Sequence, residues 1–362
     1  MKKSLSGLVA VTALMFIGCG NNISEDTNAT KDSNTSLTIN ATSKNQIKMV
    51  GSSTVYPFAS AVAEELGATG GVPTPVVEST GTGGGMKMFC ADKGSPDITN
   101  ASRQMKAKEY EECQKNGITN ITQAKIGYDG IVLAQDKASA PMNLTRMQIF
   151  LAVANEVPSK DGKMLIKNPY KKWSDIDTSL PNRPIIVYGP PKSSGTRDSF
   201  EEMIMQHFTE KELKSIYEAA GYKKYSRIRT DGVYIDSGEN DNLIVQKLTK
   251  DKNAIGIFGY GFLEENADKI VGSIIDGSIP TPENIASGKY PISRSLFFYV
   301  KNDNRAVTPA IDKYVELFMS EKMIGDRGNL KKLGLIPLEK SAREAMVKDV
   351  LAKKVLTPGE LK

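Results

Sequence analysis

The sequence predicts an α/β protein of about two domains, in which mainly parallel sheets are flanked by helices. Short apolar runs alternate with amphipathic helical runs through most of the 362 residues, and strands separated by helices usually pair in parallel. The length suits about two domains. Three short segments rich in Ser, Thr and Gly each stand where a helix should begin, as loops at the carboxyl ends of parallel strands do.

The predicted elements follow one another as short runs along the chain. Strands are predicted where the sequence is continuously apolar or β-branched, at residues 47–50, 74–78, 126–134, 184–188, 255–258 and 296–300. Helices are predicted where apolar residues recur at helical spacing, at residues 56–66, 86–91, 145–154, 198–208, 242–249, 309–319 and 342–353. We expect the last helix to pack on the first domain.

The first residues predict export and lipid anchoring. Lys2 and Lys3 precede an apolar run at 5–17 that is too short to span a bilayer. That run ends in the sequence FIGC, which resembles a bacterial lipobox, so residues 1–19 are predicted to be a lipoprotein signal peptide. Cys19 would become the lipidated first residue of a protein held at the periplasmic or cell-surface face of a bacterial membrane. The alternative is an ordinary signal peptide with a cysteine near its end.

Residues 20–46 are predicted to be a flexible tether. They are rich in Asn, Ser and Thr and hold almost no bulky apolar residue, so they cannot bury enough surface to fold. A tether would let the folded body reach a partner on the same membrane, and the alternative is a leader that acts only as a spacer. Both interpretations place the start of the fold near Ile47. No later apolar stretch is long enough for a transmembrane helix.

Cysteine and histidine usage argues against metal chemistry. With Cys19 lipidated, Cys90 and Cys113 are left and are expected to form a disulfide in an oxidising compartment. Two unpaired buried thiols are the alternative. The single histidine, His207, stands late in a predicted helix and suits a surface or capping position. No cluster has metal-ligand spacing, so we expect neither a metal nor a cofactor.

The charge balance favours a small anionic ligand over nucleic acid. The formal net charge is +5, and removal of Lys2 and Lys3 leaves +3 on the mature chain. No basic stripe alternates with aromatic residues, so nucleic-acid binding is not expected. A mild positive excess suits an anionic small molecule.

The three polar segments are GSST at 51–54, GTGGG at 81–85 and SSGTR at 193–197. A helix N-terminus exposes unpaired N–H groups and the positive end of the helix dipole. Glycine permits close backbone approach, and Ser or Thr adds a hydroxyl donor. Each segment alone is typical of an ordinary N-cap. Together they predict a dehydrated site for a tetrahedral oxyanion, with no base to activate a serine as a nucleophile.

Six motifs resemble one known family. They are VGSSTVYPF at 50–58, ESTGTGGGMK at 78–87, PDITNASR at 96–103, SSGTRD at 193–198, ENDN at 239–242 and AIGIFGY at 254–260. Their order and spacing, across most of residues 47–338, resemble the PstS-like phosphate-binding proteins of bacterial ABC-type phosphate importers. Each motif alone is weak, and together they are specific.

The resemblance implies a two-lobed periplasmic-binding-protein fold of type II. Each lobe would hold a mainly parallel sheet flanked by helices, and two crossing segments near 128–134 and 292–300 would join the lobes. Lobe 1 would comprise residues 47–130 and 294–362, and lobe 2 residues 131–293. The resemblance also implies a monomer without enzymatic activity, which binds inorganic phosphate with high affinity and delivers it to the permease and ATPase of an importer.

The resemblance also implies a set of ligand-binding residues. Lobe 1 would contribute Ser53, Thr54, Val55, Thr82, Gly83 and Ser102, and lobe 2 would contribute Ser194, Gly195 and Thr196. The sequence departs from some family members at two positions. Arg103 stands where those members have an Asp, and Pro190 or Pro191 stands where they have an Arg. We therefore expect Arg103 and Arg197 to supply positive charge through bidentate contacts. The alternative is that they pair with carboxylates such as Asp97 or Asp198.

Selectivity requires a proton acceptor, because phosphate keeps a proton near neutral pH and sulfate does not. The candidates are Asp129, Asp198 and Asp241, each of which also suits a cap or hinge position. A binding protein for sulfate or molybdate is the alternative within the same class. A phosphate-ester-hydrolysing enzyme and an adhesion or sensor lipoprotein are the alternatives from other classes.

Overall fold

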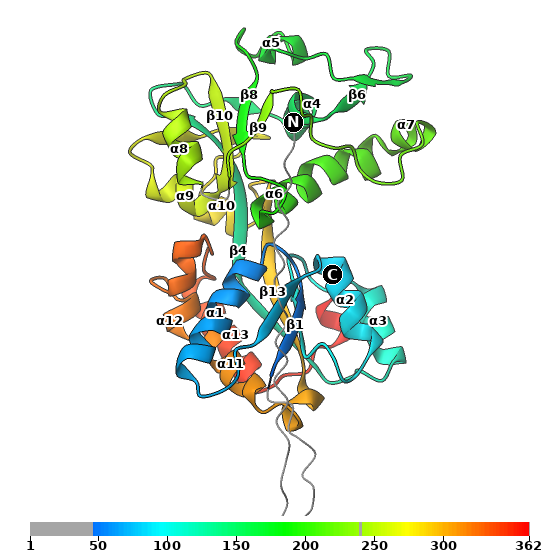
Figure 1. Cartoon of the computed structure of the whole chain (residues 1–362), viewed down its shortest axis with the longest axis vertical. Coiled ribbons are helices and arrows are strands. Elements are labelled where there is room, and N and C mark those ends of the chain that lie inside the picture. The colour runs from blue at the N-terminus through cyan, green and yellow to red at the C-terminus, as the bar shows by residue number, and fades with distance from the viewer. Residues whose placement is uncertain (1–45, 239–240, 362) are drawn as a thin grey trace, which may run out of the picture. The chain divides into compact units, whose positions relative to one another are not determined.

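The computed structural model describes residues 46–238 and 241–361 (Figure 1). The predicted signal peptide, the lipidation site at Cys19 and the tether, apart from Gln46, lie outside the described residues. In the part that is described, none of the helices has the length and apolar composition needed to cross a membrane.

Lobe 1 is built on three parallel strands, in which β1 pairs with both β2 and β3. Helix α1 buries Phe58, Val62 and Leu66 at helical spacing, and these side chains enter a core shared with Phe298 and Phe318. The elements of this part are β1 (Lys48–Gly51), α1 (Tyr56–Thr69), β2 (Val76–Ser79), α2 (Thr82–Ala91), β3 (Ile98–Ala101) and α3 (Ala107–Lys115).

Lobe 2 repeats this pattern, with β8 between β9 and β10 and all three parallel. Its separate core includes Phe150, Trp173, Phe200 and Phe258. The elements of this part are β5 (Asn143–Leu144), α4 (Arg146–Val153), β6 (Glu156–Pro158), β7 (Leu165–Lys167), α5 (Trp173–Ile176), β8 (Ile186–Gly189), α6 (Gly195–Phe200), η1 (Glu201–Gln206), η2 (Phe208–Glu212), α7 (Lys214–Ala219), β9 (Tyr234–Asp236), α8 (Asn242–Leu248), β10 (Ala254–Gly259), α9 (Tyr260–Glu265), β11 (Ile270–Gly272), β12 (Ile274–Ile275) and α10 (Pro282–Ala286).

Two long strands, β4 (Ile121–Asp136) and β13 (Ser293–Lys301), connect the lobes (Figure 1). They pair with each other in antiparallel fashion up to Gly130, and from Ile131 onward β4 pairs instead with β10 and β11. The sheet of the described residues therefore runs β2-β1-β3-β13-β4-β10-β8-β9. The predicted parallel order holds within each outer set of three strands. The crossings are antiparallel because the chain passes to lobe 2 and returns.

The C-terminal segment returns to lobe 1. Helix α13 packs against α11 and β4, and Val350 joins the lobe 1 core. The remaining elements are η3 (Asn302–Ala306), α11 (Ala310–Phe318), α12 (Glu321–Ile324), η4 (Asn329–Leu333), α13 (Lys340–Leu351) and η5 (Pro358–Glu360).

Two local features refine the sequence predictions. Cys90 on α2 and Cys113 on α3 form a buried disulfide, which confirms the expected pair. The predicted helix at 198–208 is longer than expected. It begins as α6 at Gly195 and continues through η1 and η2, whose turns have the wider π-helical form. Such turns are rare and often occur at functional sites.

Candidate functional site

All three polar segments lie at the carboxyl end of a strand and lead into a helix. Segment 51–54 joins β1 to α1, segment 81–85 opens α2 after β2, and segment 193–197 opens α6 after β8. Parallel strands direct their carboxyl ends to one edge of a sheet, which is where ligands of α/β proteins bind. The fold therefore places the three segments at the cleft between the lobes.

A polar cavity of about 430 Å³ lies at this position. Its walls come from both lobes, from residues Ser52, Ser53, Thr54, Gly81, Thr82, Gly83, Ser102, Arg103, Lys106, Asp198, Glu202, Gln206 and Tyr225. Seven residues expected at the site are among them: Ser53, Thr54, Thr82, Gly83, Ser102, Arg103 and Asp198.

Two buried pairs of hydroxyl groups organise the cavity wall. The Oγ1 atom of Thr82 lies 3.0 Å from Oγ of Ser102 and accepts a hydrogen bond from the Ser102 N–H at 3.1 Å. The Oγ1 atom of Thr54 lies 2.6 Å from Oγ of Ser199, which also donates to the Gly195 carbonyl at 2.9 Å. The second pair links lobe 1 to lobe 2 at the cavity. A hydroxyl group both donates and accepts hydrogen bonds, and its O–H bond can rotate. One hydroxyl of each pair can therefore donate to an anion in the cavity.

The segment at 193–197 contacts the first segment and does not line the cavity. A Cβ atom on Gly195 would stand 2.5 Å from the Ser53 carbonyl oxygen, so only glycine permits this approach between the lobes. Ser194 and Thr196, on either side of it, are partly buried. Val55 is fully buried at the N-terminus of α1. The structure thus sets Ser194, Gly195, Thr196 and Val55 beside the cavity, away from its surface.

Arg103 lines the cavity while forming a bidentate ion pair. Its Nη1 and Nη2 atoms donate to the two carboxylate oxygens of Glu109 at 2.8 and 2.7 Å. The hydrogen bond to Glu109 raises the pKa of Arg103 above its ordinary value. Burial would raise the pKa of Glu109, but the hydrogen bonds from Arg103 and Lys106 hold it below its ordinary value. Arg103 therefore pairs with a carboxylate, although with Glu109 rather than Asp97.

Arg197 is not brought to the cavity. Its side chain is 4% exposed, and Nε donates to Glu201 at 2.6 Å while Nη1 donates to the Pro190 carbonyl and to Asp236. Its guanidinium lies 4.5 Å from the centre of the Tyr234 ring. These contacts stay within lobe 2. Arg197 thus has the ion-paired arrangement that was the alternative expectation, with Glu201 and Asp236 in place of Asp198.

Two oppositely charged side chains, each about 8% exposed, lie on the crossing strands and form no ion pair with each other among the described residues. Asp129 of β4 and Arg294 of β13 are direct partners in the antiparallel register. Nη1 of Arg294 donates to Ser102 Oγ at 2.8 Å and to Glu202 Oε2 at 2.7 Å. Among the described residues, Nε and Nη2 of Arg294 and Oδ2 of Asp129 have no hydrogen-bond partner.

The three candidate proton acceptors differ in position. Asp129 is 8% exposed, and burial raises its pKa above the ordinary value, although Arg294, the Ser199 hydroxyl and the Gly130 N–H partly offset this. Asp198 lines the cavity and is exposed. Asp241 is buried at the start of α8 and is not among the residues that line the cavity. Only Asp129 is both buried and opposite a cation on the crossing strands.

Sequence reasoning missed several residues of the site. Arg294, Ser199, Glu202 and Tyr225 contact or line the cavity region. A signal for Arg294 was available, because a charged residue beside a predicted crossing segment requires a partner. The other three could not be identified without the lobe arrangement. His207 pairs with Glu212 at 2.8 Å and does not line this cavity.

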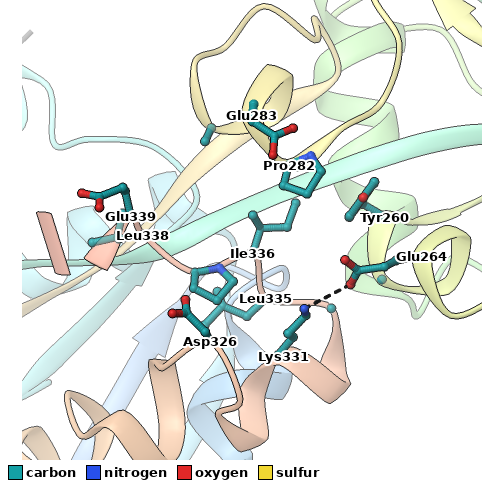
Figure 2. A pocket seen from close by; sticks show the side chains of 14 residues that line it. Tyr260, Glu264, Pro282, Glu283, Asp326, Lys331, Leu335, Ile336, Leu338 and Glu339 are labelled. Atoms are coloured by element: carbon teal, nitrogen blue, oxygen red, sulfur yellow. Dashed lines mark ion pairs between the residues drawn. The ribbon is translucent and has the colours of Figure 1, made fainter. Parts of the chain in front are cut away.

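A second cavity, of about 360 Å³, is lined by residues of α9, of α10 and of the segment 326–339 that follows α12 (Figure 2). Pro282, Leu335 and Ile336 are among its apolar lining residues, and Lys331 pairs with Glu264, also of the lining, at 3.4 Å. No predicted site residue lines it. Within 46–238 and 241–361, no group of His, Cys, Asp or Glu side chains is arranged to hold a metal ion.

Comparisons with known proteins agree with this architecture. A profile of the PBP superfamily domain matches residues 37–322. Protein SphX of Synechococcus elongatus is 30% identical over 302 residues, which cover 82% of this chain and 78% of SphX. Phosphate-binding protein PstS of Staphylococcus haemolyticus is 27% identical over 284 residues, covering 77% of this chain and 78% of that protein. In the crystal structure of a possible phosphate binding protein from Planctomyces limnophilus, the chain is 29% identical in sequence to this one and superposes with a TM-score of 0.70. The match covers 85% of this chain and 98% of that chain.

Proposed function

Because the chain belongs to the PBP superfamily and is a PstS-like member, we propose that it binds inorganic phosphate and delivers it to an ABC-type importer. One observation carries the proposal. A hydroxyl-lined cavity between the lobes is backed by Arg294 and Asp129, whose buried atoms have unused hydrogen-bonding capacity among the described residues. Buried donors and acceptors without partners are costly, so a ligand that uses them stabilises the bound state.

Positive charge for the anion comes from two arginines in this proposal. Arg103 lines the cavity, and its planar guanidinium still has donors beyond those given to Glu109. Arg294 donates to Ser102 from behind the wall, and its Nε and Nη2 groups are available to an anion or to a bridging hydroxyl. In a site screened from water, charge-assisted hydrogen bonds of this kind are about twice as strong as neutral ones.

We assign the proton acceptor to Asp129 rather than to Asp198 or Asp241. A carboxylate discriminates best where water does not screen it, and Asp129 is buried while Asp198 is exposed. Burial raises the pKa of Asp129, and Arg294 on the partner strand opposes that rise, which favours the ionised form that accepts a hydrogen bond from the phosphate O–H. Sulfate has no proton to offer at neutral pH, so it would meet repulsion from the same oxygen. This arrangement favours phosphate over sulfate or molybdate.

Lipid anchoring and export belong to the same proposal. A signal peptide at 1–19, lipidation of Cys19 and a tether to residue 46 would hold the two-lobed body near its importer. The buried Cys90–Cys113 disulfide supports this, because disulfides persist mainly in exported proteins. We propose that the protein acts as a monomer and that binding, without a chemical step, is its whole activity.

Isothermal titration of the ligand-stripped, full-length chain tests the proposal. We expect phosphate to bind at micromolar or tighter affinity at pH 7, and a hundredfold excess of sulfate to leave that affinity unchanged. No heat of binding with phosphate would overturn the assignment. Equal binding of sulfate would overturn the role given to Asp129.

A further inference from the structure

We propose that the cleft also accepts a phosphate that carries a second anionic group, as inorganic diphosphate does. This inference rests on the proposed function, because the first phosphoryl group would occupy the cavity described above. The second group would occupy an adjoining cavity in the same cleft. The single-phosphate proposal uses none of that adjoining space.

The adjoining cavity has a volume of about 410 Å³. Four residues line both cavities, so the two spaces share a wall: Arg103, Lys106, Glu202 and Gln206. An orthophosphate ion has five heavy atoms and needs roughly 100–150 Å³, on a scale where one water occupies about 30 Å³. One orthophosphate therefore fills only part of the phosphate cavity and leaves the adjoining cavity empty.

The helical segment formed by α6, η1 and η2 runs along both cavities. Asp198, Glu202, Gln206 and Glu210 follow one another at intervals of four residues and line the cleft in sequence. Residues spaced in this way lie near one face of a helix, and twelve residues at the ordinary helical rise make the distance from the first to the last roughly 18 Å. The unusual π-helical turns occur in this segment, which is the kind of place where such turns serve function. The cleft is thus an elongated groove.

The charges of the adjoining cavity favour an anion. Four cationic side chains line it, Arg103 and Lys106 from lobe 1 and Arg146 and Lys211 from lobe 2, against the two carboxylates Glu202 and Glu210. Both carboxylates are already engaged. Glu202 accepts from Arg294 at 2.7 Å, and Glu210 accepts from Gln206 at 2.7 Å.

The neighbouring ion pairs limit which cations are available. Arg103 pairs with Glu109 and Arg146 pairs with Asp276, both at 2.7 Å, and the His207 ring lies 2.8 Å from Glu212. In the described part of the chain, Lys106 and Lys211 form no ion pair. They extend from opposite lobes into one space, so a second phosphoryl group could neutralise both. Their exposure to solvent makes the expected gain moderate and sensitive to salt.

Titration of the full-length chain with orthophosphate, inorganic diphosphate and glycerol phosphate tests the inference. We expect diphosphate to displace orthophosphate and to bind at least as tightly at low salt, with an advantage that shrinks as salt rises. The variant Lys211→Glu should weaken diphosphate binding about three- to tenfold and leave orthophosphate binding unchanged. Lys214→Glu is the matched control, because Lys214 pairs with Glu218 and lines neither cavity. This variant should bind both ligands with the affinity of the wild type.

The outcomes separate this inference from the proposed function. Orthophosphate binding without competition by diphosphate would overturn the inference and leave the phosphate proposal intact. A different result would be glycerol phosphate binding as tightly as diphosphate, with no effect of Lys211→Glu on either ligand. That result would mean that the adjoining cavity accepts a neutral polar group, and it would also overturn the inference. Diphosphate binding in the absence of orthophosphate binding would support the inference and overturn the proposed function.

Discussion

Arg294 Nη1 lies 2.8 Å from Oγ of Ser102, although 192 residues separate the two positions. The contact connects the returning strand β13 to the loop after β3, and Ser102 in turn contacts Thr82 at the start of α2. Arg294 also reaches Glu202 of lobe 2. One side chain therefore links both lobes and the cavity wall, so its replacement should affect ligand binding more than any single hydroxyl does.

Arg294→Gln should weaken phosphate binding roughly 10- to 100-fold, because a hydrogen bond to a charged group contributes about 1.5–3 kcal/mol. Arg294→Lys should recover part of this loss, since the charge returns without the planar fork. Isothermal titration measures both variants. Arg227→Gln, at an exposed position outside the phosphate cavity, is the control and should bind as the wild type does. Unchanged affinity in Arg294→Gln would remove this residue from the site.

Asp129→Asn should weaken phosphate binding roughly tenfold or more and allow measurable sulfate binding, because an amide can donate to an oxyanion that a carboxylate repels. Competition titrations at pH 7 measure the change in selectivity. A variant that still rejects sulfate would mean that another group is the acceptor.

The same substitution should stabilise the ligand-free protein at neutral pH. The pKa of Asp129 is raised in the folded state, chiefly by burial, so the folded protein binds a proton more tightly than the unfolded chain. Folding stability therefore falls as pH rises above the ordinary pKa of Asp, and a neutral Asn avoids that loss. Thermal unfolding from pH 4 to 8 should show the advantage of Asp129→Asn growing with pH. A constant difference would contradict this.

Arg103→Gln should mainly lower phosphate affinity, whereas Arg197→Gln should mainly lower folding stability. Arg103 lines the cavity, so its loss should weaken phosphate binding roughly tenfold with little loss of stability. Arg197 is buried between Glu201, Asp236 and the Tyr234 ring. Its loss should cost about 3 kcal/mol of unfolding free energy, because two carboxylates lose their partner. Urea unfolding and titration of each variant separate the two effects. The reverse pattern would exchange the roles of these arginines.

Lys301 should make stability depend on pH in the alkaline range. Its side chain is buried above the Phe89 ring, and burial lowers its pKa to about 8, with Asp92 and Asp97 opposing the shift. The unfolded chain therefore holds more protons between pH 8 and the ordinary pKa of lysine, and stability rises with pH in that interval. Relative to Lys301→Met, the wild type should gain about 2–3 kcal/mol from pH 7 to 10.5. A stability difference between the wild type and Lys301→Met that stays constant from pH 7 to 10.5 would contradict the prediction.

Removal of the disulfide should destabilise lobe 1. Cys90 and Cys113 are 23 positions apart, and closing a loop of this length contributes about 3 kcal/mol on the chain-entropy estimate. The double variant Cys90→Ala/Cys113→Ala should lose about that amount in urea unfolding. The reduced wild type is the matched control and should lose a similar amount. Phosphate affinity should stay unchanged, because neither cysteine lines the cavity.

Local sequence located three polar turns that lead into helices. Helix α1 begins at Tyr56 as predicted, whereas α2 and α6 begin at Thr82 and Gly195, inside their polar segments and ahead of the predicted starts at 86 and 198. Strand β3 was not predicted as a strand, because Thr99 and Asn100 interrupt its apolar pattern. It is nevertheless fully buried between β1 and β13, where backbone pairing on both sides outweighs weak strand propensity.

The sequence by itself determined the α/β class, the helix starts that carry Ser, Thr and Gly, and the pairing of two cysteines. These features depend on interactions within a few residues or on composition. Only the tertiary structure decided which charges lie at the polar cavity between the lobes. Arg197 belongs to a polar segment yet is held by Glu201 and Asp236, whereas Arg294 reaches Ser102 through strand register. Ion pairing depends on distance and burial across the sheet, and residues far apart along the chain determine both.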